Sequence, residues 1–257
     1  MNSREIWIAF TTIFVKEVRR FMRIWPQTLV PPVITVTLYF IIFGNLIGSR
    51  IGTMDGFSYM EFVVPGLIMM GVITNSYGNV VSSFFGAKFQ HSIEELTVSP
   101  VPNWVILLGF VLGGVTRGLA VGFIVTLMSL FFTKLSINNL PLTVLVVLLT
   151  SVLFSIAGLI NAIFANNFDD ISIIPTFVLT PLIYLGGVFY SVSLLPDFWA
   201  GVSKFNPVLY MVNAFRYGVL GISDISVGVA LSMISGFIAI AFSYALYLLN
   251  SGTRIRS

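Results

Sequence analysis

Long apolar runs recur along the whole chain, and this feature constrains its fold more than any other. The hydrocarbon core of a bilayer is about 30 Å thick, so a helix of about 20 apolar residues can cross it. Charged residues make up 9% of the 257 residues, whereas about a quarter of a soluble domain is charged. The sequence therefore predicts an all-α integral membrane protein that crosses the membrane several times.

Six apolar runs are long enough to be spans. They are Trp25–Ile47, Tyr59–Phe85, Trp104–Phe132, Pro141–Ala165, Ile171–Tyr190 and Val227–Leu249. Pro31 and Pro32 predict a bend in the first of them, because proline removes a helical hydrogen bond. No repeat or second domain interrupts the pattern. We therefore expect one transmembrane domain over residues 1–257, with six spans within 25–249 and a short tail at 250–257.

The distribution of basic residues predicts how these spans are oriented. Eight Lys and Arg residues fall on the side that holds both termini, and four fall on the other side. Cytoplasmic loops carry the excess of positive charge, so we expect both termini, residues 86–103 and residues 166–170 in the cytoplasm. This topology accounts for the net charge of +3, and no basic cluster is large enough to indicate a nucleic-acid-binding surface.

Residues 3–23 have the pattern of an amphipathic helix before the first span. A basic amphipathic helix of this kind lies in the plane of the headgroups and does not cross the membrane. We therefore expect residues 1–24 to form a cytoplasmic interfacial helix. Its apolar stripe would contain Ile6, Phe10, Ile13, Phe14, Val18 and Phe21, and its polar face Thr12, Lys16, Arg19, Arg20 and Arg23.

The longest outward-facing segment, Ser191–Asp224, is too apolar for an ordinary loop, yet prolines interrupt it. Pro196 and Pro207 each suit the first position of a helix, and Asn206 suits the N-cap before Pro207. The pattern predicts two short re-entrant helices before the sixth span, since backbone at membrane depth is tolerated when it is helical or packed on protein. A plain interfacial hairpin is the alternative.

The sequence lacks the residues that most enzyme sites need. It contains no G-x-x-x-x-G-K-[ST] motif, no cysteine and a single histidine, which exclude a P-loop, a disulfide framework and the common zinc sites. The neighbouring carboxylates Glu94-Glu95 and Asp169-Asp170 point about 100° apart on a helix and do not form a convincing acid–base pair. We predict no catalytic, metal-binding or cofactor-binding residue.

Arg117 is the one ionisable residue near the middle of a predicted span. Its burial in lipid costs several kcal/mol, so it should face protein or water. Two interpretations remain open. Arg117 either lines a translocation path or dimer seam, or it pairs structurally with a carbonyl group or with Glu61. A proton-coupled carrier would need intramembrane acids or histidines, and only Glu61, at the outer end of the second span, is a candidate. Close helix approach beside Arg117 would be allowed by Gly113, Gly114, Gly118 and Gly122.

A polar segment, Gly86–Asn103, stands between the second and third spans. Its sequence is "GAKFQHSIEELTVSPVPN". Ser92 and Glu95 fit a capping box, and Pro100 and Pro102 would end the helix soon after it begins. The segment therefore predicts a short cytoplasmic helix, with a solvated hairpin as the alternative.

Two stretches resemble the ABC-2-type transporter permeases. "HSIEELTVSPVPNWVILLG" is similar to the segment after the second span in that family, and "YLGGVFYSVSLLPDFWAGVSKFNPVLYMVNAFRYG" is similar to its Gly-Gly, Leu-Pro and Asn-Pro pattern with a following Arg. The resemblance covers nearly the whole chain. It implies six spans, an N-terminal connecting helix, a coupling helix after the second span and re-entrant outward helices.

The resemblance also implies a function. It implies a permease subunit of an ATP-driven exporter in the bacterial inner membrane, working as a homodimer. A separately encoded ATPase would bind ATP and Mg, so this chain would be no enzyme itself. A self-sufficient secondary carrier or channel is the alternative, followed by a scaffold protein without a transport path. The substrate is not predicted.

Given this resemblance, the short cytoplasmic helix is a candidate docking site for the ATPase. Apolar anchors would share one face, either Glu94 or Glu95 would supply the polar contact, and Lys88 and His91 would lie on the more exposed face. The predicted anchors are Phe89, Ile93 and Leu96. In the outward segment, Asn206, Pro207 and Arg216 are the candidate residues of the re-entrant helices.

Overall fold

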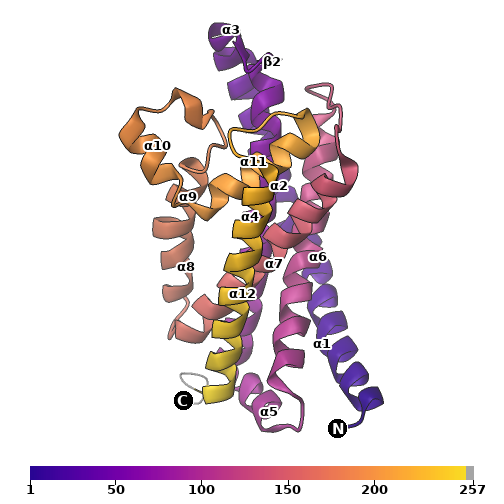
Figure 1. Cartoon of the computed structure of the whole chain (residues 1–257). Coiled ribbons are helices and arrows are strands. Elements are labelled where there is room, and N and C mark those ends of the chain that lie inside the picture. Colours follow the sequence, from indigo (N-terminus) through magenta and orange to yellow (C-terminus); the bar gives the residue numbers. More distant parts are fainter. Residues whose placement is uncertain (253–257) are drawn as a thin grey trace.

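The chain folds into a bundle of long helices with a small hairpin at one end (Figure 1). The computed structural model describes residues 1–252, and within them all side chains except those of residues 44–47, 49 and 51. The predicted tail charges Arg254 and Arg256 lie outside the described residues. The long helices are α1 (Ser3–Arg23), α2 (Trp25–Tyr39), α4 (Tyr59–Phe89), α6 (Asn103–Ser129), α7 (Leu140–Phe164) and α12 (Val227–Ser251).

Shorter elements connect these helices. They are η1 (Phe40–Ile47), α3 (Gly48–Ile51), β1 (Thr53–Met54), β2 (Phe57–Ser58), α5 (Ser92–Val98), α8 (Asp170–Ile174), η2 (Pro175–Leu179), α9 (Thr180–Tyr184), η3 (Val192–Leu194), α10 (Asp197–Ser203) and α11 (Pro207–Leu220). Thr53 pairs with Ser58 in the antiparallel hairpin. Asp55 and Gly56 both have positive φ values at its turn, as a two-residue hairpin loop with type I′ geometry requires.

In the described part of the chain, five helices are long and apolar enough to cross a membrane. These five helices correspond to the first, second, third, fourth and sixth predicted spans, and they confirm that each of those runs forms a long apolar helix. The predicted fifth span, Ile171–Tyr190, is shorter than expected, because α8, η2 and α9 form one helix from Asp170 to Tyr184. Fifteen helical residues extend about 22 Å, which is less than the core thickness of about 30 Å. The six-span arrangement therefore remains a prediction.

Helix α4 forms the centre of the bundle, and most of its side chains are buried. It packs between α6 and α7, and small residues on these helices allow the close approach. A Cβ atom added to Gly158 of α7 would lie 2.6 Å from the Tyr77 carbonyl oxygen of α4. Helices α2 and α12, in contrast, leave most of their side chains exposed, so their apolar faces are free to contact lipid or another subunit.

Helix α1 packs along α6, and its predicted apolar stripe faces the bundle. Ile13 and Phe21 are buried, and a Cβ atom added to Gly109 of α6 would lie 2.5 Å from Ile13 Cγ2. The helix begins with a capping box between Asn2 and Glu5, which satisfies two backbone groups that have no partner inside a helix. The amphipathic helix predicted before the first span is therefore present, although its depth relative to a membrane remains a prediction.

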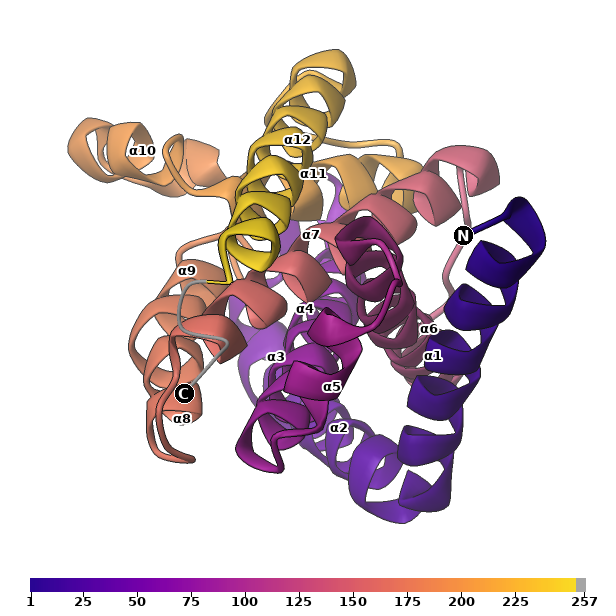
Figure 2. The same cartoon turned by 90° about the horizontal axis from the view of Figure 1, so that it is seen from below.

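The two ends of the bundle carry different elements. The N-terminus, the end of α12 and α5 lie at one end, while the hairpin, α10 and α11 lie at the other (Figure 1). Asn103, the first residue of α6, donates to the carbonyl oxygen of Leu249 in α12 at 3.2 Å. Seen from the end that carries α5, α1 runs along one side of the bundle and α10 projects from another (Figure 2). This arrangement agrees with the prediction that α5 and the N-terminus share one side of the membrane.

Candidate functional site

The short helix α5 begins differently from the predicted capping box. Its N-cap is His91, which has a left-handed backbone (φ +57°), and no side chain caps the helix. Ser92 is already helical, and its Oγ donates to the Ala87 carbonyl oxygen at 3.1 Å. The capping box of Ser92 with Glu95 is therefore wrong, because the tight turn after α4 moves the helix start by one residue. Glu95 is left exposed.

The three predicted anchors of α5 do not behave alike. Ile93 is fully buried within this subunit, so its role as an anchor for a partner is wrong. Leu96 is partly buried against the same core. Phe89, at the end of α4, is 59% exposed and contacts the Phe168 ring with centroids 5.0 Å apart. Val98, which the sequence reading missed, is 77% exposed. The outward surface therefore consists of Phe89, Glu95 and Val98, with Glu94 half-buried beside it.

Lys88 does not lie on the exposed face where it was predicted. Its Nζ donates to the carbonyl oxygens of Ile163 and Ala165, both at 2.7 Å. These carbonyls belong to the end of α7, where the last carbonyls of a helix have no helical donor and a cation is favourable. Lys88 therefore joins the ends of α4 and α7. His91 is exposed as predicted, with its Nδ1 3.0 Å from Oε1 of Glu94.

Arg117 lies in a pocket of about 250 Å³ between α2, α4 and α6. Its Nη2 donates to Asn75 Oδ1 at 3.0 Å. The alternative in which Arg117 pairs with Glu61 is wrong, because Glu61 closes a capping box with Ser58 at the start of α4. Within the described residues, Nε of Arg117 is buried without a hydrogen-bond partner. The pocket is thus lined by one guanidinium group together with both polar and apolar side chains.

A second cation, Arg20 of α1, lies one helical turn along α4 from this site. Its Nη2 donates to both the backbone and the side-chain oxygen of Asn79, at 2.8 and 2.9 Å. Its Nε lies 3.4 Å from Oε2 of Glu17, which is fully buried. Arg20 was predicted on the polar face, so its inward position is a correction. Glu17 was missed, although the spacing of Ile13, Glu17 and Phe21 places it within the apolar stripe.

The predicted N-cap of the second helix within Ser191–Asp224 is confirmed. Pro207 is the first residue of α11, and Asn206 Oδ1 accepts a hydrogen bond from the Val208 amide at 2.9 Å. Nδ2 of Asn206 also donates to the Leu182 carbonyl oxygen at 2.6 Å, which ties the start of α11 to α9. Pro196, in contrast, is the N-cap of α10 and not its first helical residue.

Helices α10 and α11 differ in burial. Helix α11 is buried along most of its length, whereas α10 exposes large apolar side chains, including Phe198 and Trp199. The last carbonyls of α11 are satisfied by the loop before α7, since the amide of Asn139 donates to the Gly218 carbonyl oxygen at 2.7 Å. Helix α11 is therefore held within the bundle, while α10 lies on its surface.

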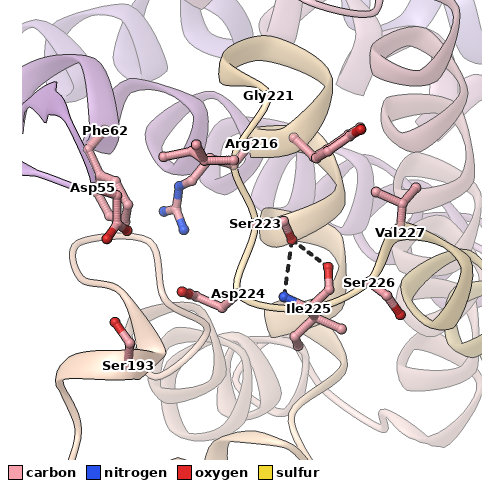
Figure 3. A pocket seen from close by; sticks show the side chains of 12 residues that line it. Asp55, Phe62, Ser193, Arg216, Gly221, Ser223, Asp224, Ile225, Ser226 and Val227 are labelled. Carbon is pink, nitrogen blue, oxygen red and sulfur yellow. Dashed lines mark hydrogen bonds between the residues drawn. The ribbon is translucent and has the colours of Figure 1, made fainter.

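Arg216 of α11 is 1% exposed, and its guanidinium group has one hydrogen bond among the described residues. Nη2 donates to the Gly187 carbonyl oxygen at 2.7 Å. The guanidinium carbon lies 3.9 Å from the centre of the Phe62 ring, a distance at which a cation interacts favourably with the ring face. Nε and Nη1 are buried without a partner. Figure 3 shows this side chain pointing into a pocket, which lies at the end of the bundle that carries the hairpin.

The pocket beside Arg216 has a volume of about 560 Å³. Asp224, in the loop after α11, connects the segments that form one side of this pocket. Its carboxylate accepts hydrogen bonds from Ser191 Oγ at 2.6 Å and from the Val192 amide at 3.1 Å. Its own amide donates to Asn213 Oδ1 at 2.9 Å. Sequence reasoning missed Asp224, because these partners are about 10 to 30 residues distant along the chain.

Among the described residues, no group of three or more His, Cys, Asp or Glu side chains could hold a metal ion. The polar clusters that do exist join helices to one another or line the two pockets. They are suited to binding and to transmitting movement between helices. We find in them no nucleophile–base pair of the kind that catalysis requires.

The chain belongs to the ABC-2 type transporter family, whose profile matches residues 8–220. The inner membrane transport permease YadH of Escherichia coli (strain K12) is 60% identical over 251 residues, which cover 98% of this chain and 98% of YadH. The nodulation protein J of Rhizobium leguminosarum bv. viciae is 23% identical over 218 residues, which cover 83% of each chain. The predicted resemblance to ABC-2-type permeases is thereby confirmed.

Proposed function

We propose that this chain is the permease subunit of an ATP-driven exporter in the bacterial inner membrane. In this proposal it works as a homodimer with a separately encoded, YadG-like ATPase, which binds ATP and Mg. Membership of the ABC-2 family supports a transport role. The 60% sequence identity with an inner membrane transport permease supports a location in the inner membrane. The sequence has no P-loop of its own, which agrees with hydrolysis by a partner.

One observation carries the proposal most directly, namely the position of α5. This short helix lies beyond the end of the bundle that also carries the N-terminus (Figure 1). It exposes an apolar and an acidic side chain, Val98 and Glu95, next to the exposed Phe89. Exposed apolar side chains with a charged neighbour are typical of a protein-binding surface. In the proposal this surface, formed by Phe89, Glu95 and Val98, contacts the ATPase.

The contacts of α5 also explain how a push on it would reach the membrane helices. Ile93 anchors α5 in the core of its own subunit, so the helix moves with the bundle and not as a loose loop. Lys88, in the last turn of α4, is bonded to the end of α7. A force applied to α5 by the ATPase would therefore act on α4 and α7 together, the two helices at the centre of the bundle.

The Arg117 pocket is the proposed contact with the transported molecule or with the second subunit. It opens between α2, which is largely exposed, and the buried centre of the bundle. Pro31 and Pro32 leave the carbonyls of Gln27 and Thr28 in this wall of the pocket without their α-helical donors. The guanidinium group of Arg117 offers donors in this pocket, and the free carbonyls offer acceptors. Together they could bind a polar group within an otherwise apolar layer.

Reconstitution of the permease with its ATPase tests the function. We expect co-purification of the two proteins, and in liposomes with ATP on the side of α5 we expect ATP-dependent movement of a lipid, drug or glycan probe into the lumen. Movement by the permease alone without nucleotide would instead indicate a secondary carrier or channel. ATP-dependent movement out of the lumen would contradict export and leave the permease assignment standing.

Topology is tested independently with single introduced cysteines. In sealed right-side-out vesicles, an impermeant maleimide should label a cysteine at Phe198 from outside and should not label one at Ser99. The opposite pattern would place α5 outside the cell. That result would contradict its proposed contact with a cytoplasmic ATPase.

A further inference from the structure

The pocket at the outer end of the bundle has buried donors that no residue in the described structure uses. Arg216 is almost completely buried, yet Nε and Nη1 have no hydrogen-bond partner. Buried polar groups are nearly always hydrogen-bonded, and an unpaired charged donor is especially costly. The side chain points into the pocket (Figure 3). A ligand with acceptor oxygens that enters this pocket would provide the missing hydrogen-bond partners of Nε and Nη1 of Arg216.

The rim of the same pocket carries carboxylates. Asp55 lies exposed at the turn of the hairpin, and among the described residues it has no ion-pair partner within 4.0 Å. Asp224 lies below the guanidinium group in Figure 3, whereas Asp55 lies to its left, and each oxygen of Asp224 already accepts a hydrogen bond. Of the two carboxylates, Asp55 is the one whose oxygens have no side-chain or backbone donor among the described residues, so it has more acceptor capacity left.

The formal charges of the pocket decide which ligand it suits. Arg216 contributes one positive charge, and Asp55 and Asp224 contribute one negative charge each, so these three residues sum to −1. A simple oxyanion would satisfy Arg216 but would raise the negative charge to −2. A simple cation would suit Asp55 but would leave Nε and Nη1 of Arg216 without acceptors. A zwitterion satisfies both residues and leaves the total charge unchanged.

We propose that this pocket binds a zwitterionic phosphoethanolamine-type group, with the phosphate on Arg216 and the ammonium on Asp55. A guanidinium group offers several N–H donors in a planar fork that matches phosphate oxygens. The free Nε and Nη1 donors therefore favour a phosphate at the floor of the pocket. Such a group can come from a lipid headgroup of the outer leaflet or from a soluble zwitterion, and the pocket chemistry is the same for both.

Binding measurements on the purified permease test this proposal, and they need no ATPase. In nanodiscs of phosphatidylglycerol, glycerophosphoethanolamine should bind at least about tenfold more tightly than glycerophosphate or ethanolamine, since each of these lacks one charge-assisted contact. Retention of phosphatidylethanolamine, measured by native mass spectrometry, reports on the lipid. Retention of the lipid alone assigns the pocket to a membrane headgroup, and binding of the soluble probe alone assigns it to a soluble zwitterion.

Two variants and one control complete the experiment. Asp55→Asn, at an exposed turn that should fold normally, should weaken binding of the zwitterion about tenfold or more and should strengthen binding of glycerophosphate. Arg216→Lys should weaken binding of both. Asp197→Asn removes an exposed carboxylate at the same end but outside the pocket, and it should bind like the parent. The proposal is overturned if neither zwitterionic probe binds, or if Asp55→Asn binds like Asp197→Asn.

Discussion

Arg20 of α1 and Asn79 of α4 are joined by two hydrogen bonds from one guanidinium nitrogen, at 2.8 and 2.9 Å. They connect the helix before the first span to the centre of the bundle. The fully buried carboxylate of Glu17 lies beside them. Since a buried charge is costly unless it is paired, the position of α1 depends on this cluster as well as on its apolar stripe.

The first prediction concerns this cluster. Arg20→Ala should lower the free energy of unfolding by more than about 1.5 kcal/mol, because it removes charge-assisted hydrogen bonds to Asn79 and Glu17. The buried carboxylate of Glu17 would then keep only the long contact of its Oε1 with Nζ of Lys16, at 3.9 Å. Arg19→Ala, on the exposed side of the same helix, is the matched control and should have little effect. Adding Glu17→Gln to Arg20→Ala should recover part of the loss. Thermal unfolding in detergent measures all three, and equal melting temperatures for Arg20→Ala and Arg19→Ala would contradict the role of the cluster.

The second prediction concerns the space between α1 and α6. A Cβ atom at Gly113 would lie 2.5 Å from Glu17 Cβ, so Gly113→Ala should push the helices apart and cost about 1–3 kcal/mol. Gly78→Ala is the control, because a Cβ atom there meets nothing within 4 Å. It should be neutral or slightly stabilising, since alanine favours a helix. Limited proteolysis of α1 should rise in Gly113→Ala alone. Protection equal to that of the parent would show that α1 can shift without cost.

The third prediction concerns Lys88. Lys88→Ala should lower the melting temperature, because the carbonyls of Ile163 and Ala165 lose a charged donor, a loss of about 1.5–3 kcal/mol. His91→Ala removes an exposed contact with Glu94 and should change stability by less than about 1 kcal/mol. If Lys88 also transmits force, Lys88→Ala should retain ATPase binding but lose the coupling of hydrolysis to transport. Normal coupling in a destabilised Lys88→Ala variant would restrict the residue to a structural role.

The fourth prediction separates the two faces of α5. Ile93→Ala should cost about 2–5 kcal/mol of stability, as expected for a large-to-small change in a core. Phe89→Ala and Glu95→Lys, on the proposed docking surface, should lower the melting temperature much less than Ile93→Ala does and should weaken capture of the ATPase. Truncation of a buried interface anchor typically costs over about 1 kcal/mol. Pull-down of the ATPase and thermal unfolding should therefore rank these variants in opposite orders. The same order in both measurements would argue against a docking surface on α5.

The fifth prediction concerns Arg117. Arg117→Leu should insert into the membrane at least as well as the parent, because insertion no longer carries a buried charge. If Arg117 lines a path or a dimer seam, transport should fall even though the folded protein accumulates normally. Asn75→Ala removes only the hydrogen-bond partner at 3.0 Å and should have a smaller effect. Transport at the parental rate by Arg117→Leu would assign Arg117 a structural role.

Features that depend on local sequence were predictable. The long apolar runs predicted five of the long helices, and Asn206 followed by Pro207 predicted the start of α11. Both depend on composition or on neighbouring residues, which a single sequence displays directly. The clustering of prolines and glycines between residues 171 and 190 could have indicated that the fifth helix would be short. The apolar composition of that run concealed this signal.

Features that depend on contacts between distant segments were not predictable. The inward position of Ile93 and the bonds from Lys88 to the end of α7 arise from how α4, α5 and α7 meet. A helical-face argument placed Phe89, Ile93 and Leu96 on one face. It could not show that Phe89 ends α4 and stays exposed while the bundle covers Ile93. Asp224 acquired its role in the same way, through partners in other loops.

The short fifth helix has a consequence for the irregular residues that follow it. The amides of Leu185 and Gly186 still donate to carbonyl oxygens of the last helical turn, those of Pro181 and Ile183. If this segment crosses the bilayer, residues 187–190 must cover the remaining depth without helical hydrogen bonds, and lipid offers no substitute donors or acceptors. Protein supplies them here. Arg216 donates to the Gly187 carbonyl oxygen and the Tyr59 hydroxyl group donates to that of Phe189, while Val188 is fully buried against α4. Side chains of α4 and α11 thus provide the hydrogen bonds that water would otherwise provide, for a stretch of backbone that would be unstable in contact with lipid alone.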